Sequence, residues 1–245
     1  QAFNAAFLEH GLRWDWSRKE YAELLRTSGG KERLAVYIDS LALPRQEKAR
    51  LKGMVQLIHD SKTRIYAELI ADGGAPLRPG VARIIGEARA AGVRLGIAST
   101  TTSANVSALI SAQFGADAWN WFEALACGDV VENKKPAPDI YTRALGMLRL
   151  PASDCVAFED SVNGLNSAKA AGLYTVVTPT AWNEGQDFSD ADLLLRSLGD
   201  ADAPLAAEDA RQAGGPQLTL TRLQQLHAAA SRPAAASQRR GQPCR

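Results

Sequence analysis

Cysteine is scarce in this sequence, and the spacing of the few cysteines excludes two classes of protein. Cys127, Cys155 and Cys244 are odd in number and far apart in the chain. This pattern fits neither a zinc motif nor a framework of disulfide bonds. Because disulfides persist mainly in oxidising compartments, the scarcity of cysteine favours a reducing compartment, and we expect a cytoplasmic protein.

Charge imbalance and long apolar runs are also missing. The formal net charge is +1 over 245 residues, so nothing suggests a surface for nucleic acids or other polyanions. No apolar run approaches the ~18 residues of a membrane-spanning helix, and the N-terminus lacks the layout of a signal peptide. We expect a monomer that binds a small molecule, with no nucleic-acid or membrane partner.

The first part of the chain has a helical pattern. Residues 1–72 carry apolar side chains at helical spacing without strand alternation, and residues 45–71 form one long helical pattern. The stretch ADGGAPLRPGV (71–81) then breaks the chain with three glycines and two prolines, which marks a hinge or domain boundary. We expect a small all-helical cap domain over residues 1–75.

After this boundary, strands alternate with helices. The expected strands are 93–99, 124–127, 155–159, 173–178 and 191–195. We expect residues 155–158 to form a short buried strand. This alternation predicts an α/β core over residues 76–199, built on a doubly wound parallel sheet. Ligands of such sheets bind outside the carboxyl ends of the strands. For residues 200–245 we expect a C-terminal helix and a disordered tail.

Hydroxyl side chains follow the first of these strands. Ser99, Thr100 and Thr101 begin the turn into the next helix. Hydroxyls and free backbone N–H groups at a helix start suit a phosphate group. An ordinary run of helix N-cap residues is the alternative.

A lysine is presented at a second strand end. Lys135 precedes Pro136, which favours an extended backbone, and Pro138 suits the first turn of the following helix. We therefore expect Lys135 to stand on a rigid loop at the carboxyl edge of the sheet. The neighbouring Lys134 is expected to be solvated.

Two adjacent carboxylates, Glu159 and Asp160, follow a third strand. Two like charges at one strand end repel each other unless a cation lies beside them, and carboxylate oxygens suit magnesium. An N-cap aspartate beside a surface glutamate is the alternative. Hydroxyls, a lysine and an acid pair at successive strand ends together indicate a site for phosphate and Mg²⁺.

These motifs resemble a known family. The order of IAST, KPAPDIY and FEDSVNG is similar to motifs two, three and four of the haloacid dehalogenase superfamily of phosphohydrolases, and the helical block resembles the cap of that superfamily. TSGGKERL (27–34), STTTSANV and KKPAPDIY are most similar to its CbbY-like branch, and the resemblance covers residues 1–198. It implies a phosphatase with Mg²⁺ as cofactor.

The resemblance also implies roles for individual residues. Asp160 would bind Mg²⁺ directly, and Glu159 would support the site or act as a second ligand. Lys135 would neutralise charge on the phosphoryl oxygens. Ser99 would hydrogen-bond the transferring phosphoryl group. Further substrate contacts are expected from Thr100, Thr101 and Asn163.

One family feature is missing from the sequence. The family's nucleophile is an aspartate in a D-x-D-G-T stretch on the first strand, and no such stretch occurs here. Since the chain starts at Gln1 and its only methionines are Met54 and Met147, we expect this strand just upstream, and we expect the 245-residue chain alone to be inactive. A sugar phosphomutase of the same fold and an inactive ligand-binding chain are the alternatives.

The cap contributes a further candidate site. In GGKER, Lys31 and Arg33 place positive charge after two glycines and would hold a second phosphate or the far end of a sugar. The alternative is a helix start with a solvated charged face. The CbbY-like branch implies a pentulose bisphosphate, such as xylulose 1,5-bisphosphate, as the substrate.

Overall fold

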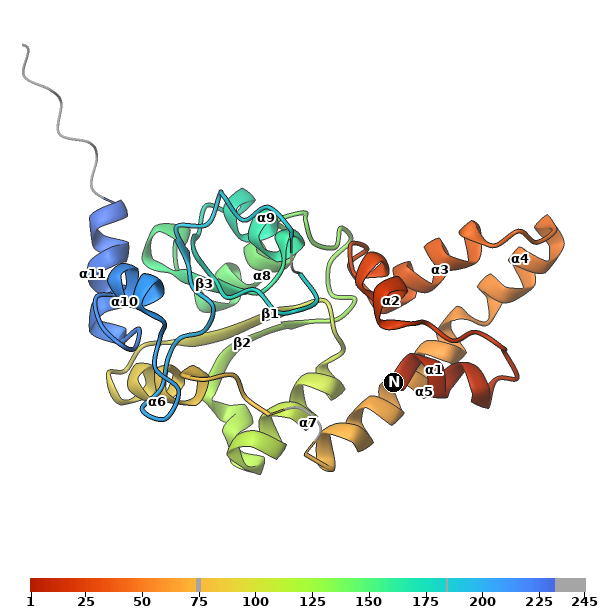
Figure 1. The fold of residues 1–245 in the computed structure, drawn as a ribbon, viewed down its shortest axis with the longest axis horizontal. Coiled ribbons are helices and arrows are strands. Elements are labelled where there is room, and N and C mark those ends of the chain that lie inside the picture. The colour runs from red at the N-terminus through yellow and green to blue at the C-terminus, as the bar shows by residue number, and fades with distance from the viewer. Residues whose placement is uncertain (74–75, 184, 232–245) are drawn as a thin grey trace, which may run out of the picture.

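The computed structural model describes residues 1–73, 76–183 and 185–231. Figure 1 shows two bodies side by side, an all-helical cap from the first part of the chain and an α/β body from the rest. The cap helices are α1 (Ala2–Glu9), α2 (Arg18–Leu24), α3 (Gly30–Ser40), α4 (Arg45–Gly53) and α5 (Val55–Ala71). The helical prediction for this part of the chain agrees with the structure.

The long helix predicted over residues 45–71 is wrong in one respect. It is divided into α4 and α5, which meet at Met54. The Met54 N–H bonds the carbonyl of Leu51 at 3.0 Å, which tightens the last turn of α4. Gly53 stands at this junction, and glycine is a poor residue for the interior of a helix.

Aromatic rings fill the core of the cap. Phe7 is fully buried, and its ring centroid lies 4.8 Å from that of Trp16 and 5.2 Å from that of Trp14. Trp14 and Trp16 also contact Tyr37 of α3. Large buried rings provide much apolar area per residue, so this small helical unit has a hydrophobic core of its own.

The α/β body contains short strands and the helices that cover them. In chain order its elements are α6 (Val81–Ala90), β1 (Leu95–Ser99), α7 (Ser103–Phe114), η1 (Ala116–Trp121), β2 (Phe122–Cys127), α8 (Asp139–Leu148), η2 (Ala152–Asp154), β3 (Val156–Glu159), α9 (Val162–Ala170), β4 (Tyr174–Val177), β5 (Leu193–Leu194), α10 (Ala207–Ala213) and α11 (Leu220–Ala230). The strand pairs of the described residues are all parallel, as predicted for this class.

The single doubly wound sheet that we predicted is divided in two. One sheet has the order β1-β2 and the other has the order β3-β4-β5, and no hydrogen-bonded ladder joins them within the described residues. Helix α8 nevertheless spans the division, because one apolar cluster joins Ala98 and Ala126 of the first sheet to Ala157 of the second. The edges of β1 and β3 therefore belong to the same body without pairing each other.

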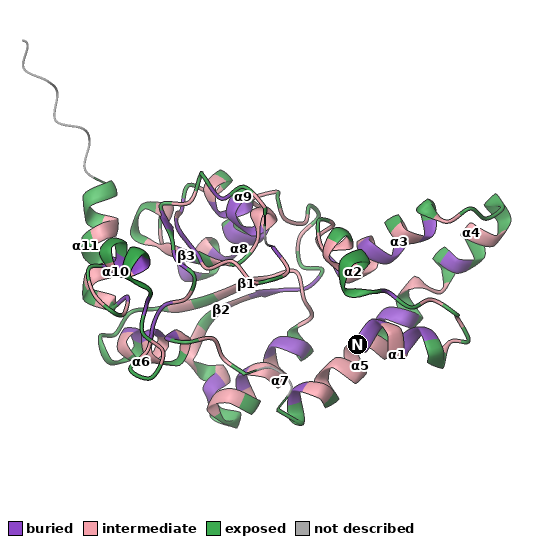
Figure 2. Ribbon diagram, in the orientation of Figure 1, coloured by how far each residue is buried: buried purple, intermediate pink, exposed green. Residues whose placement is uncertain are grey.

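This division changes the burial of the two edge strands. None of the residues of β1 is buried, as Figure 2 shows, and Phe158 of β3 is 42% exposed. By contrast, Ala124 and Ala126 of β2 are fully buried. The prediction of a short buried strand over 155–158 is thus wrong for Phe158, which lies on a strand at the edge of its sheet in the described residues.

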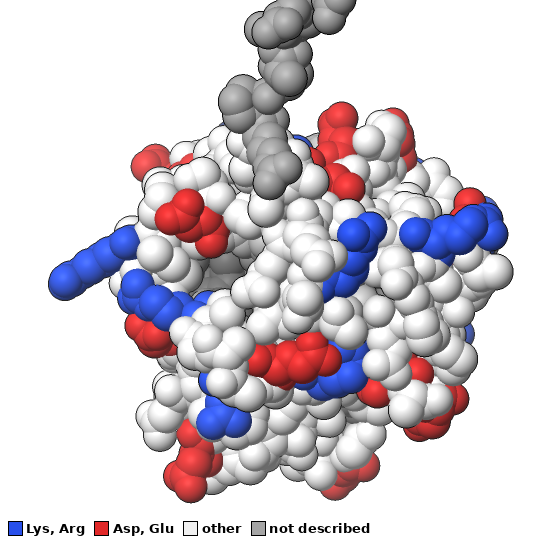
Figure 3. Space-filling model, turned by 90° about the vertical axis from the view of Figure 1, so that its left-hand side faces the viewer, with Lys and Arg blue, Asp and Glu red and all other residues white. Residues whose placement is uncertain are grey.

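The last helices complete the α/β body. Leu218 and Leu223 pack with Ile84 of α6 and Leu195, which follows β5. The tail predicted beyond residue 231 lies outside the described residues. Figure 3 views the end of the body away from the cap, where basic and acidic side chains are interspersed around a hollow. Across the described parts of the chain, no helix is both long enough and apolar enough to cross a bilayer.

Candidate active site

The three polar clusters predicted at strand ends meet through Lys135. Its Nζ donates to the carbonyl of Ala98, at the end of β1, at 3.0 Å, and to Oε1 of Glu159, at the end of β3, at 2.5 Å. Lys135 thus spans the two sheets at their carboxyl ends. Its side chain is only 11% exposed and that of Glu159 only 7%, so the ion pair is well shielded from water.

The Glu159 carboxylate is fixed on several sides. Its Oε1 accepts hydrogen bonds from Lys135 and from the Tyr141 hydroxyl. On the other side, a Cβ built on Gly164 would lie 1.8 Å from Oε2, so a larger residue there would displace the Glu159 carboxylate from this position. Burial raises the pKa of Tyr141 far above its usual range, and the negative charge of Glu159 adds to the shift. The Tyr141 hydroxyl therefore stays protonated and donates.

Asp160 differs from Glu159 in its surroundings. The residue reaches solvent, while the protein around its carboxyl group and the charge of Glu159 raise its pKa. The N-cap of α9 is Ser161, whose hydroxyl accepts from the Gly164 N–H at 3.2 Å. The alternative of an N-cap aspartate beside a surface glutamate is therefore wrong. An accessible carboxylate with a raised pKa is one that a cation would stabilise in its charged form.

These residues fit a magnesium ion in part. Mg²⁺ is commonly held by one or two carboxylates, with waters and substrate phosphates completing its shell. Asp160 offers such a carboxylate, whereas Oε1 of Glu159 is occupied by its two donors. In the residues that the structure describes, no group of three or more His, Cys, Asp or Glu side chains could hold a metal. The described residues therefore supply part of a magnesium shell, through the Asp160 carboxylate.

The hydroxyl cluster after β1 forms a turn and not the helix cap. Ser99 Oγ accepts from the Thr101 N–H at 3.2 Å, and Thr101 Oγ1 accepts from the Asn105 side chain at 2.9 Å. The N-cap of α7 is Thr102. The N-cap alternative for 99–101 is thus wrong, because Ser99 ends β1 and Thr100 and Thr101 lie between this strand and the cap residue Thr102.

The expectation that Lys134 is solvated is wrong. Its Nζ donates to the carbonyl of Gly128 at 3.0 Å and to Asp129, and its side chain is 12% exposed. Both lysines of KKP are therefore fixed, but on different partners. Lys134 supports the loop after β2, whereas Lys135 joins the ends of β1 and β3.

Two of the predicted substrate-binding residues connect the cap to the α/β body. Lys31 of α3 pairs with Asp129 of the loop after β2 and also reaches Gln56 at 3.3 Å. Asn163 of α9 donates to the carbonyl of Arg26 at 2.7 Å. The two bodies are thus joined at the same side on which the strands end, and the substrate roles of both residues stay predictions.

Arg33 lies deeper in the cap than its predicted role requires. It is buried, and its guanidinium donates to the carbonyls of Leu24 at 3.0 Å and Thr27 at 3.1 Å. Its guanidinium also lies 5.4 Å from the ring centroid of Tyr21. Arg33 therefore ties α2 to α3, and its contact with a substrate stays a prediction.

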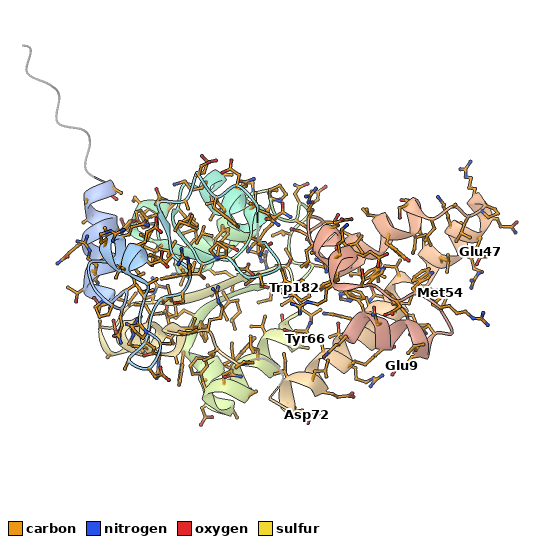
Figure 4. The ribbon with its side chains drawn as sticks, in the orientation of Figure 1. Glu9, Glu47, Met54, Tyr66, Asp72 and Trp182 are labelled. Carbon is orange, nitrogen blue, oxygen red and sulfur yellow. The ribbon has the colours of Figure 1, made fainter. Side chains whose placement is uncertain are left out.

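Sequence reasoning missed a cation on α5. The Nζ of Lys62 lies 4.7 Å from the ring centroid of Tyr66 and 5.7 Å from that of Phe3, and among the described residues no acceptor bonds it. Burial lowers the pKa of Lys62, and the charge of Arg33 lowers it further. Figure 4 places Tyr66 and Trp182 on the facing sides of the cap and the α/β body. The i, i+4 spacing of Lys62 and Tyr66 was the available sequence signal.

Sequence reasoning also missed the link between Tyr21 of α2 and Trp182, which follows β4. Their ring centroids are 5.6 Å apart at nearly right angles, and Arg18 lies over the Trp182 ring. Only a contact between distant segments could reveal this link, because nothing near either residue in the sequence marks it.

A helical cap over an α/β body, with a lysine and an acid pair at the carboxyl ends of parallel strands, defines a capped α/β protein with a candidate phosphate site. Residues 1–172 match the family described as haloacid dehalogenase-like hydrolase, and the chain belongs to this family. The predicted family and enzyme class are confirmed.

The predicted branch is confirmed by closely similar relatives. The chain is 50% identical to protein CbbY of Rhodobacter capsulatus over 199 residues, which covers 81% of this chain and 85% of that protein. It is 48% identical to the plasmid-encoded protein CbbY of Cupriavidus necator, with 84% and 81% of the two chains covered.

A solved structure is similar as well. A mutant form of CbbY from Rhodobacter sphaeroides in complex with xylulose-(1,5)bisphosphate is 44% identical, with a TM-score of 0.73, covering 82% of this chain and 88% of that chain. A β-phosphoglucomutase from Clostridium difficile is 17% identical with a TM-score of 0.65, which shows the common fold alone.

Proposed function

We propose that this protein is a Mg²⁺-dependent phosphatase of small sugar phosphates and that it prefers a pentulose bisphosphate such as xylulose 1,5-bisphosphate. The bridge that Lys135 makes between Ala98 and Glu159 carries this proposal. It gathers a cation, an acid pair and the hydroxyls of the Ser99 turn at one edge of the parallel strands. The similarity to CbbY, which binds xylulose bisphosphate, supports the choice of substrate.

Each residue of the site has a distinct task in this proposal. Asp160 would hold the magnesium ion, which supplies positive charge against the phosphoryl oxygens. Lys135 places a second positive charge beside those oxygens, and Glu159 holds Lys135 in place. The Ser99 and Thr100 hydroxyls donate to the phosphoryl group. Such fixed donors act mainly by stabilising charge that develops during phosphoryl transfer.

The nucleophile is the part of the site that we place outside these 245 residues. We propose that a strand with the D-x-D stretch of this family pairs between β1 and β3 and carries the aspartate that is phosphorylated. The two sheets support this, because their facing edges are unpaired while α8 and Lys135 span both. Phe158, an apolar residue of the edge strand β3, is 42% exposed, which agrees with further apolar cover in the complete protein.

Phosphate release tests the function and the missing strand together. The measurement compares this chain with a form extended upstream by the D-x-D segment, on xylulose 1,5-bisphosphate with and without Mg²⁺. We expect turnover only from the extended form and only with the metal. Turnover by the chain alone would place the nucleophile within it. An extended form that isomerises a sugar phosphate without releasing phosphate would indicate the mutase alternative, and one that binds without turnover would indicate the inactive alternative.

The cap supports a preference for two phosphates. Lys62 has no acceptor among the described residues, and the buried Arg33 adds positive charge beside it. Holding an unpaired ammonium partly buried is costly unless an anion joins it, so a second phosphate suits this position. The ratio of kcat/KM for the bisphosphate over p-nitrophenyl phosphate measures the preference, and a ratio near one would contradict it.

A further inference from the structure

We propose that Tyr141 is a positioning residue of this site, because its hydroxyl orients the Glu159 carboxylate and its ring supports the ammonium group of Lys135. The proposal rests on the phosphatase function proposed above. Tyr141 is 8% exposed, its hydroxyl donates to Oε1 of Glu159, and its ring centroid lies 4.9 Å from Nζ of Lys135. One side chain therefore contacts both members of the buried ion pair.

The backbone that carries Tyr141 is well fixed. The residue lies in the first turn of α8, next to the fully buried Ile140. Asp139 accepts from the N–H of Asn133 at 3.3 Å and from its side chain at 2.9 Å, which ties the start of α8 to the loop before Lys135. The hydroxyl therefore reaches Glu159 from a rigid helix, and it can hold the carboxylate at a defined place.

The second donor matters because Lys135 has two tasks. A buried ion pair is favourable only where additional hydrogen bonds satisfy the charged groups. Lys135 would use one of its N–H groups to bind a phosphoryl group. The Tyr141 hydroxyl would still hold the Glu159 carboxylate from one side, and Gly164 would restrict its movement on the other. Glu159 then keeps its place beside Asp160 during the reaction. Loss of the hydroxyl should therefore affect kcat more than KM.

The first test removes the hydroxyl alone, in the complete protein with the upstream segment. Tyr141→Phe should lower kcat by roughly 10–100-fold and weaken Mn²⁺ binding, measured by electron paramagnetic resonance as a probe of the Mg²⁺ site, by about tenfold. KM for the bisphosphate should change by less than about threefold. The matched control is Tyr174→Phe, because the Tyr174 ring packs on His227 at 5.5 Å and no partner of its hydroxyl is found among the described residues. This control should change none of the three quantities.

A double-mutant comparison separates positioning from a general packing role. In a Glu159→Gln background, Tyr141→Phe should add less than about twofold, because the carboxylate that it orients is already gone. The Glu159→Gln background also removes the carboxylate charge that loses a donor in Tyr141→Phe. The comparison can therefore still be made if Tyr141→Phe alone folds poorly. The same loss in both backgrounds would overturn the proposal, as would a silent Tyr141→Phe. A wild-type protein that neither binds Mn²⁺ nor releases phosphate would instead overturn the proposed function.

Discussion

The cap and the α/β body differ in how completely their apolar groups are covered. In the cap, Phe7 is fully buried within a cluster of aromatic rings contributed by its own helices. In the α/β body, β1 and β3 have unpaired facing edges and Phe158 is 42% exposed. The cap therefore covers its apolar groups with its own helices. In the α/β body, the unpaired edges of β1 and β3 leave a gap, called the seam below, next to the candidate site.

The candidate site lies at the same seam between β1 and β3. Lys135, Glu159 and Tyr141 meet across it, and they are held by polar contacts and not by strand pairing. A parallel sheet normally gains backbone hydrogen bonds from both neighbours of a central strand. Within the described residues, Lys135 and Glu159 join the two halves at their carboxyl ends, and the strand proposed above would complete the ladder. A variant in the cap should therefore affect unfolding, and a variant at the seam should affect chemistry.

The largest effect should come from emptying the cap core. Phe7→Ala should lower the free energy of unfolding by about 3–5 kcal/mol, because it leaves a cavity among rings. Phe158→Ala in the same chain should cost less than ~1 kcal/mol, since the side chain is already half-exposed. Urea unfolding followed by tryptophan fluorescence measures both. Equal costs would mean that the seam is as well covered as the cap.

At the seam, Lys135→Ala should reduce catalysis strongly. We expect a loss of about 10²–10³-fold in kcat for the complete protein, typical of removing one donor to developing charge. Lys134→Ala is the matched control and should lose less than about tenfold, because Lys134 supports the loop at Gly128 and Asp129 without reaching Glu159. A reversed order would transfer the catalytic role to Lys134.

The cap should influence specificity more than chemistry. Lys62→Met keeps most of the apolar stem and removes the charge, so kcat/KM for the bisphosphate should fall by roughly 10–100-fold, the value of a charged hydrogen bond of about 1.5–3 kcal/mol. p-Nitrophenyl phosphate should be hydrolysed as before. Lys52→Met is the control. Lys52 forms its own ion pair with Asp39, at 2.7 Å, and this pair is separate from Lys62. An unchanged substrate ratio would remove Lys62 from the substrate site.

The smallest effect concerns the junction of the two bodies. Hydrogen bonds from Lys134 and Lys31 lower the pKa of Asp129 from 3.8 to about 2. A lowered folded-state pKa means that the ion pairs contribute fully above pH 3.8 and are lost as the pH falls through about 2. Carbon-13 NMR of the Asp129 carboxyl group should show this midpoint. Lys31→Ala should move it upward, and an unmoved midpoint would mean that the cap–body ion pair does not form in solution.

Local patterns determined much of this protein from the sequence alone. Helical spacing predicted the cap, alternating strands and helices predicted the α/β class, and the motifs around Ser99, Lys135 and Glu159 predicted which strand ends hold the candidate site. These features depend on residues close together in the chain, since backbone geometry sets the side-chain periodicity of helices and strands and proline restricts its neighbours.

Only the tertiary structure decided which distant groups meet. Lys31 contacts Asp129 across 98 positions of sequence, Asn163 contacts Arg26 across 137, and Lys135 contacts Ala98 across 37. The division of the sheet and the exposure of Phe158 likewise depend on whether a neighbouring strand is present. A short sequence pattern specifies how a segment folds, but the partner of a side chain depends on how whole segments pack, and many residues far from the side chain determine that packing.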